Sequence, residues 1–372
     1  MRILVVNAGS SSLKLRVLDD GDEVTASADL SVSPDATGDV DGAVADAIAG
    51  FGDIDAVGHR IVHGGTEFTG PVLIDDDVEA RLRALTDLAP LHQPKSLAAL
   101  DAASAALPGV PAVACFDTAF HAGMPAAAST YAIPAEWRQR FALKRYGFHG
   151  LSHAYTSRRA AELLGRRVES LRVVTCHLGA GASLAAVAGG RSVDTTMGFT
   201  PLDGLVMATR SGSLDPGLVL WLEEHVGTPP AELAAALEHR SGLLGLAGTA
   251  DMRIVVADAR EGEPAARLAL DVYAHRLRGA IAAMAAAMGG MDALVFTGGV
   301  GENSPEVRSL AVGGLGFLGL HLDEEANAGG GGGDTDRTVS TPDSPLPTLV
   351  VAAREDLEIA RETRQVLSPG TT

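Results

Sequence analysis

A strand–turn–strand pattern that occurs twice constrains the fold of this chain more than any other feature. Residues 3–6 form an apolar run rich in β-branched side chains, a turn of small residues follows, and residues 13–18 alternate between apolar and polar. Alternation with a period of two is typical of a β-strand. Residues 173–187 repeat the pattern with a turn that is one residue longer. Two hairpins of one type, one in each half of the chain, predict a duplicated architecture.

Apolar runs and amphipathic segments alternate along the rest of the chain. The apolar residues Leu277, Ile281, Met284 and Met288 have the spacing of one face of a helix. We expect strands at residues 56–62, 112–116, 293–296 and 347–352, and helices at 77–88, 267–288 and 356–367. This order predicts an α/β protein with mixed sheets flanked by helices. The glycines at 329–333 indicate a flexible surface loop.

The net charge excludes two classes of partner. The 372 residues include 47 acidic and 29 basic side chains, which gives a formal charge of -18. This is the wrong sign for a protein whose main partner is nucleic acid or an anionic membrane. Because 46% of the residues are apolar, the chain can bury enough surface to fold, which excludes general disorder. An anionic ligand would have to be bound by local cations or backbone amides.

The cysteines and the N-terminal sequence predict a cytoplasmic protein. Cys115 and Cys176 each lie in a short apolar run without a second cysteine or histidine at metal-ligand spacing, which favours buried thiols. The apolar run after Met1 is too short for the core of a signal peptide. The longest uncharged stretches are interrupted by glycine, histidine or proline, so we expect no membrane span.

Both hairpin turns are candidate phosphate sites. The first turn combines closely spaced backbone amides with three serine hydroxyls and the ammonium group of Lys14, all of which suit phosphate oxygens. In the second turn, His177 stands where Asn7 stands in the first. The alternative for each is an ordinary hairpin turn, because glycine-rich turns are common.

Histidines and arginines beside glycines are further candidates. His149 and His153 are four residues apart, but Gly147 and Gly150 disfavour a helix that would place both rings on one face, and we reject a zinc site. His149 between glycines is interpreted instead as a donor held close to a ligand. Arginines beside turn residues, as in 58–65 and 208–213, can bind a carboxylate or phosphoryl group through two hydrogen bonds. Each of them taken singly could equally be a surface arginine.

Nine motifs along essentially the whole chain resemble those of the acetate kinase family, which lies within the sugar kinase, heat-shock ATPase and actin superfamily. In order they are residues 5–14 (VVNAGSSSLK), 59–65 (HRIVHGG), 116–121 (FDTAFH), 145–150 (RYGFHG), 177–181 (HLGAG), 200–205 (TPLDGL), 209–212 (TRSG), 250–253 (ADMR) and 296–303 (FTGGVGEN).

The resemblance implies a fold of two similar actin-like ATPase domains with the active site in the cleft between them. It places an N-terminal domain at 1–118, completed by a C-terminal helix at 356–372, and a nucleotide-binding domain at 119–355. It also implies a homodimer.

The activity implied by the resemblance is a reversible, Mg²⁺-dependent transfer of a phosphoryl group from ATP to acetate, which gives acetyl phosphate and ADP. The enzyme would be a phosphotransferase with a carboxyl acceptor, with Mn²⁺ as an alternative metal and a place in acetyl-CoA biosynthesis. One alternative is a propionate or other short-chain acyl kinase. The other alternative is a different class of protein: a non-enzymatic nucleotide switch or filament protein of the same superfamily.

The resemblance also implies roles for individual residues. The metal would be positioned by Asn7 and Glu355. The catalytic residues would be Lys14, Arg60, Asp117, His149 and Arg210. The acyl substrate would contact Arg60, Val62, Leu91, Phe148 and Pro201. The nucleotide would contact Ser10, Ser12, Lys14, His177, Leu178, Gly179, Ala180, Gly181, Asp251, Met252, Arg253, Gly299, Val300, Gly301, Glu302 and Asn303.

Three positions depart from the family pattern. Ala180 stands where the family usually has asparagine, which removes one polar contact near the phosphates. Gln93 replaces a usual asparagine and Asp356 a usual glutamate, and both of these changes are conservative.

Overall fold

The computed structural model describes residues 1–9, 12–31, 40–88, 93–329 and 336–368, so Ser10, Leu91 and the glycine run from residue 330 onward lie outside it. The chain divides into two compact units. Unit 1 comprises Met1–Gly123, Phe148–Tyr155 and Arg354–Thr372, and unit 2 comprises Met124–Gly147 and Thr156–Ala353. The expected domain boundaries after residues 118 and 355 stay a prediction.

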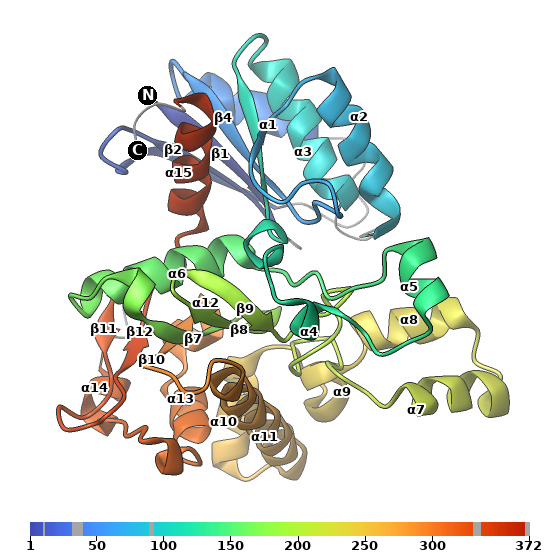
Figure 1. Cartoon of the computed structure of the whole chain (residues 1–372), viewed down its shortest axis with the longest axis vertical. Coiled ribbons are helices and arrows are strands. Elements are labelled where there is room, and N and C mark those ends of the chain that lie inside the picture. The colour runs from blue at the N-terminus through green and yellow to red at the C-terminus, as the bar shows by residue number, and fades with distance from the viewer. Residues whose placement is uncertain (10–11, 32–39, 89–92, 330–335, 369–372) are drawn as a thin grey trace. The chain divides into compact units, whose positions relative to one another are not determined.

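Unit 1 contains a six-stranded mixed sheet (Figure 1). The first three strands of the chain form an antiparallel meander, and two further strands continue the sheet parallel to the first. A short antiparallel strand forms the far edge. The order across the sheet is β3 (Val24–Ser31), β2 (Ser12–Leu18), β1 (Ile3–Ala8), β4 (Ala56–Ile61), β6 (Ala112–Phe116) and β5 (Val72–Leu73).

The sheet of unit 2 has the same plan. An antiparallel meander is again followed by two strands parallel to its first member and by a short antiparallel edge strand. Its order is β9 (Arg191–Thr195), β8 (Ala182–Ala188), β7 (Arg172–Leu178), β10 (Ala293–Thr297), β12 (Thr348–Val350) and β11 (Arg337–Thr338). This agreement in strand order and direction confirms the duplication and the α/β class expected from the two hairpins.

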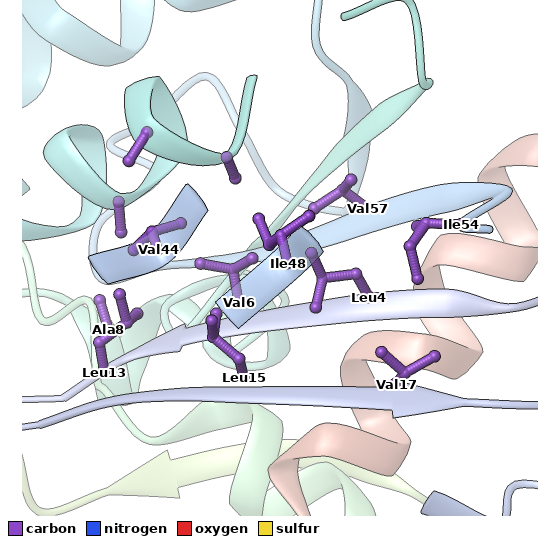
Figure 2. Packing of buried hydrophobic residues seen from close by; sticks show 13 residues of the cluster. Leu4, Val6, Ala8, Leu13, Leu15, Val17, Val44, Ile48, Ile54 and Val57 are labelled. Carbon is purple, nitrogen blue, oxygen red and sulfur yellow. The ribbon is translucent and has the colours of Figure 1, made fainter. Parts of the chain in front are cut away.

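Helices cover both faces of the unit 1 sheet. Because side chains alternate along a strand, Leu4 and Val6 point to one face while Ile3 and Val5 point to the other. The first face packs against α1 (Val40–Ala49) and α3 (Gln93–Ala106), as Figure 2 shows for Val44 of α1. The second face packs against α15 (Glu355–Leu367). The last helix of the chain is therefore part of the first core.

A glycine allows α15 to lie close to β4. A Cβ atom on Gly58 would be 2.4 Å from Thr363 Oγ1 and 2.7 Å from Ile359 Cγ2, both on α15. Any side chain at this position would push the helix away from the strand. The close contact holds Glu355, the first residue of α15, in a fixed place relative to the sheet.

The segment at 77–88, predicted as one helix, is α-helical only in its first part and 3₁₀-helical at its end. Helix α2 (Asp76–Ala84) gives way to a 3₁₀ helix, η1 (Leu85–Leu88), because the Leu85 N–H bonds to the carbonyls of both Leu82 and Arg83 and tightens the last turn. The predicted helix at 267–288 is α11 (Pro264–Ala287), which begins earlier at a proline suited to a first helical turn. Within the described residues, no helix combines the length and the apolar character needed to cross a membrane.

The remaining helices are all shorter than the 24-residue α11. They are η2 (Ala119–His121), α4 (Ala126–Ser129), α5 (Ala135–Phe141), α6 (Gly150–Leu163), η3 (Val168–Ser170), α7 (Pro216–Trp221), the π-helical η4 (Leu222–Val226), α8 (Pro230–His239), α9 (Gly242–Ala247), α10 (Met252–Glu261), α12 (Gly298–Asn303), α13 (Pro305–Val312), η5 (Gly316–Leu318) and α14 (Glu324–Ala328).

Candidate active site

Three polar side chains meet at the carboxyl ends of neighbouring strands in unit 1. Asn7 lies near the end of β1, Arg60 near the end of β4, and Asp117 directly after β6. These strands are parallel, so their carboxyl ends share one edge of the sheet, where ligands of α/β proteins commonly bind. The Asp117 N–H donates to the Ile61 carbonyl at 3.0 Å, which fixes the residue beside β4.

Arg60 and Asp117 form a buried ion pair. The arginine donates through Nη2 to Asp117 Oδ2 at 2.6 Å and through Nε at 3.1 Å, and the two side chains are 12% and 1% exposed. Its Nη1 donates to the Ala8 carbonyl at 2.7 Å and to Asn7 Oδ1 at 3.5 Å. Burial raises the pKa of Asp117, and the positive charge of Arg60 opposes that shift. Burial alone would lower the pKa of Arg60, but the charges of Asp117 and Glu355 outweigh it and raise that pKa.

Glu355 joins this cluster from the start of α15. Its Oε2 accepts a hydrogen bond from Asn7 Nδ2 at 2.8 Å, although the two residues are 348 positions apart in the chain. No cluster of three or more acidic, histidine or cysteine side chains suited to a metal occurs in the described part of the chain. Mg²⁺ is commonly held by only one or two carboxylates together with substrate phosphates and water. One carboxylate and one amide oxygen are donors of the right chemistry for it.

His149 lies beside Asp117 in a backbone conformation that is unusual for a histidine. Its φ is 56°, in the left-handed region, and its side chain is half-buried. The next residue, Gly150, donates its N–H to the Asp117 carbonyl at 2.8 Å. A Cβ on Gly150 would be 2.2 Å from that carbonyl oxygen, so only glycine permits the contact. The start of α6 is thereby held against Asp117, and His149 precedes the helix, as the glycines indicated.

Val62 and Phe148, both expected near the acyl group, are buried in unit 1. His63, which follows Val62, packs its ring edge-on to Phe148 with 5.6 Å between the ring centroids. The amide of Gln93 accepts from the His63 N–H and donates to the His63 carbonyl, each at 3.3 Å. Gln93, one of the three departures from the family pattern, thus holds the backbone beside Val62.

In the first hairpin, Lys14 lies directly opposite Asn7, on the same face of the sheet. The ammonium-bearing side chain is exposed. The Gly9 N–H donates to the Ser12 carbonyl at 2.8 Å and closes the turn. Lys14 and Asn7 therefore present their side chains side by side from neighbouring strands.

The second hairpin of the chain, formed by β7 and β8 in unit 2, lies against the glycine-rich segment at 298–303. Gly179 donates to the Gly181 carbonyl at 2.9 Å and closes the turn that includes Ala180. Gly298 has a φ of 79°, and a Cβ on it would be 2.8 Å from the Leu178 carbonyl oxygen. The two predicted nucleotide segments are thus in backbone contact, and no other residue fits at 298. Segment 298–303 is the short helix α12.

Two charged side chains hold α12 in place. Glu302 Oε1 accepts from the N–H groups of Gly298 at 2.8 Å and of Ala353 at 3.0 Å. The buried Arg308 donates to the Gly301 carbonyl at 2.7 Å and to the Glu302 carbonyl at 2.9 Å. It also binds Asn327 Oδ1 at 2.7 Å. Sequence reasoning missed Arg308 because it looks like any polar residue of an amphipathic helix.

Arg210 and Pro201 also come together in unit 2. Arg210 Nη1 donates to the Pro201 carbonyl at 3.5 Å. The Ala208 N–H donates to the Ala180 carbonyl at 3.1 Å, which links the segment of Arg210 to the second hairpin. Arg210 Nε donates to Glu238 Oε1 at 2.6 Å, a partner that no motif indicated.

Asp251, Met252 and Arg253 form the start of α10. The Asp251 carboxylate caps the helix by accepting from the Arg253 N–H at 2.9 Å, and Met252 is buried. Hydrogen bonds from the Arg253 side chain lower the pKa of Asp251 to about 2. His177 lies in β7 of the second hairpin. The other predicted nucleotide residues of this group lie in α12: Gly299, Val300 and Asn303.

Comparison with known proteins shows that this chain is similar to acetate kinases over its full length. The Acetokinase family model matches residues 43–361. An acetate kinase of Thermosipho africanus is 45% identical over all of this chain and 98% of its own length. The crystal structure of Porphyromonas gingivalis acetate kinase matches with a TM-score of 0.90 and 36% identity, covering 99% of this chain and 100% of that one. A propionate kinase from Francisella tularensis has a TM-score of 0.90 and 35% identity, covering 98% and 99%. The chain belongs to the acetokinase family.

Proposed function

We propose that this protein is a carboxylate kinase that transfers the γ-phosphoryl group of ATP to acetate, and that the reaction is reversible. The observation that carries the proposal is the full-length match to relatives named acetate kinase. The partly buried cluster of Asn7, Arg60, Asp117 and Glu355 supports it, because a cation and oxygen donors suited to a metal meet there.

The chemistry requires charge stabilisation more than proton transfer. Acetate is already ionised at neutral pH, since carboxylic acids titrate near pKa ~4. One of its oxygens forms a bond to the γ-phosphorus as the bond to the bridging oxygen of ADP breaks, and no general base is needed. The obstacle is the approach of an anion to a polyanion and the charge on the transferred phosphoryl oxygens. Arginine, lysine and histidine donors suit that task.

In unit 1, we assign the acetate carboxylate to Arg60. Asp117 would act through Arg60, because the hydrogen bonds that it accepts from both Nε and Nη2 fix the plane of the guanidinium. His149, anchored through Gly150, would donate to the moving phosphoryl group. Lys14 would contact phosphate oxygens from the neighbouring strand. A bound Mg²⁺ or Mn²⁺ would neutralise phosphate charge, and Asn7 and Glu355 are the residues that would hold it.

In unit 2, we assign the transferred phosphoryl group to Arg210 and the nucleotide to the second hairpin and α12. Glycine-rich backbone at these positions offers N–H groups to phosphates at close range. Ala180 would contribute its backbone only, in contrast to the usual asparagine. We further assign nucleotide contacts to Asp251, Met252 and Arg253.

Acetyl phosphate formation tests the function directly. We expect the purified protein, with ATP, Mg²⁺ and acetate, to produce acetyl phosphate that hydroxylamine traps as acetohydroxamate. ATP hydrolysis that is independent of acetate and gives no hydroxamate would reject the kinase and favour a nucleotide switch protein.

A propionate kinase is the second candidate, because a propionate kinase is among the similar structures. If Val62 and Phe148 close the acyl pocket, acetate should be preferred over propionate by roughly 10-fold or more, since one methylene is worth about 1–3 kcal/mol in an apolar pocket. Val62→Ala should shift the ratio of kcat/KM toward propionate, chiefly through the KM for the acid.

The control for this prediction is Val57→Ala, which removes the same atoms from the buried core beside α1 and α3. Both substitutions leave a cavity and should lower the thermal midpoint. Only Val62→Ala should alter the acetate-to-propionate ratio. An unchanged ratio in a destabilised Val62→Ala protein would remove Val62 from the pocket.

The metal assignment predicts a specific defect in Glu355→Ala. This variant should need on the order of tenfold more Mg²⁺ for half-maximal activity, because a carboxylate ligand is lost. Asp356→Ala is the matched control, since it removes the same charge from the same helical turn but from a side chain paired with Arg354 at 2.9 Å. If both variants titrate alike with Mg²⁺, Glu355 serves only the helix dipole.

We also propose that the protein is a cytoplasmic homodimer. Apolar side chains are exposed on α7 and η4, with Leu220 at 55%, Trp221 at 50% and Val226 at 59%. Exposed apolar patches commonly mark protein interfaces, and twofold dimers are the commonest oligomers. Sedimentation of wild type and Trp221→Glu tests the dimer, and cell fractionation tests the compartment.

A further inference from the structure

Both arginines of the proposed site are held by a carboxylate of their own unit. In unit 1 the partner of Arg60 is Asp117, which the motifs indicated. In unit 2 the partner of Arg210 is Glu238 on α8, with 2.6 Å between Nε and Oε1. The side chains of Arg210 and Glu238 are only 15% and 12% exposed, so this ion pair is largely, though not fully, shielded from solvent.

The atom that Glu238 binds determines what the guanidinium can do. A guanidinium is a rigid planar fork, and a carboxylate on Nε fixes the direction of that plane. Two further contacts of Arg210 are longer: Nη1 is 3.5 Å from the Pro201 carbonyl oxygen and 3.9 Å from Met207 Sδ. The short bond from Nε to Glu238 therefore constrains the direction in which the terminal nitrogens point.

Hydrogen bonds accepted by the backbone carbonyls of residues 237 and 238 hold Glu238 in position. The Glu238 carbonyl accepts from Thr209 Oγ1 at 2.8 Å, and the Leu237 carbonyl accepts from the Ser211 N–H at 3.2 Å. The residues on both sides of Arg210 are thus joined to the end of α8. A Cβ on Gly242 would be 2.7 Å from the Arg210 carbonyl oxygen, so the backbones of these two residues are closely packed.

We infer that Glu238 is a positioning residue for phosphoryl transfer, which acts by orienting the guanidinium of Arg210 before substrate binds. This inference rests on the proposed role of Arg210. Preorganised donors stabilise a transition state because no reorganisation is needed at the moment of reaction. A misplacement of about 1 Å can lower a rate by 10²-fold.

The test compares Glu238→Ala and Glu238→Gln with a control on the same helix, Glu232→Gln. Glu232 is an exposed residue that lies 3.8 Å from Arg240. We expect Glu238→Ala to lower kcat for acetyl phosphate formation by ~10- to 100-fold with little change in the KM for ATP. Glu238→Gln keeps an oxygen that can accept from Nε, and should recover much of the rate. Glu232→Gln should match wild type.

A double-mutant cycle separates positioning from a structural role. In the Arg210→Ala background, removal of Glu238 should cause no further loss of kcat, because its effect requires the arginine. A loss of the same size in both backgrounds would overturn the inference, as would a folded Glu238→Ala protein with wild-type kcat. If wild type forms no acetyl phosphate at all, the proposed function fails instead, so the two failures are distinguishable. Thermal midpoints of all variants report folding.

Discussion

Arg60→Ala is expected to lower kcat/KM for acetyl phosphate formation by about 10²- to 10³-fold or more. The substitution removes a donor that stabilises charge in the transition state, and losses of this kind are worth ~3 kcal/mol or more. It also leaves Asp117 without its charged partner at a position that is 1% exposed. Breaking a buried pair by removing one member commonly costs about 3–5 kcal/mol of stability. We therefore expect a lower thermal midpoint as well.

The pH dependence of stability identifies the origin of the lower thermal midpoint expected for Arg60→Ala. Burial raises the pKa of Asp117, and loss of Arg60 removes the charge that opposes the shift. A carboxyl group whose folded pKa lies above its unfolded value destabilises the protein once the pH exceeds the unfolded value, and protonation relieves the penalty. The difference in thermal midpoint between wild type and Arg60→Ala should thus shrink as the pH falls from 7 toward about 4.

Arg60→Lys serves as the control for charge. It retains a positive charge near Asp117 but loses the planar fork, so stability should largely return while activity stays low. Near-wild-type turnover in a folded Arg60→Ala protein, measured by hydroxamate formation, would remove Arg60 from the catalytic residues.

Arg210→Ala is expected to show a loss of activity of similar size, again about 10²- to 10³-fold. Its effect on stability should be smaller than that of Arg60→Ala, because Glu238 is 12% exposed and retains some access to water once its partner is gone. Hydroxamate formation and thermal unfolding, measured on the same preparation, separate the two quantities.

Arg240→Ala is the matched control for Arg210→Ala. This exposed arginine lies just beyond α8 and is 3.8 Å from Glu232. Its substitution therefore removes the same kind of side chain near the same helix. Exposed ion pairs of this kind contribute about 0–1 kcal/mol. If Arg210→Ala is as active as Arg240→Ala, the role assigned to Arg210 is wrong, and the inference about Glu238 loses its basis.

The sequence alone places Asn7 and Asp117 directly after apolar runs predicted as strands, at 3–6 and 112–116, whereas Arg60 falls inside the strand expected at 56–62. In the structure all three lie at one edge of the unit 1 sheet. The short helix α12 was not predicted, because a run such as Gly298–Asn303 has the composition of a turn. Its helical form depends on Glu302 and Arg308, whose side chains bind its two ends.

What the sequence by itself determined are the features that depend on neighbours along the chain: the two hairpins, the period of strands and helices, and the glycines at tight turns. Such patterns act over two to four residues and can be read locally. Only the tertiary structure decided which distant groups are paired. Glu355 reaches Asn7 because α15 packs on β4 at Gly58, and Glu238 reaches Arg210 because α8 is hydrogen-bonded to the segment at 209–211. These pairings depend on strand order and helix docking, for which no local pattern carries a signal.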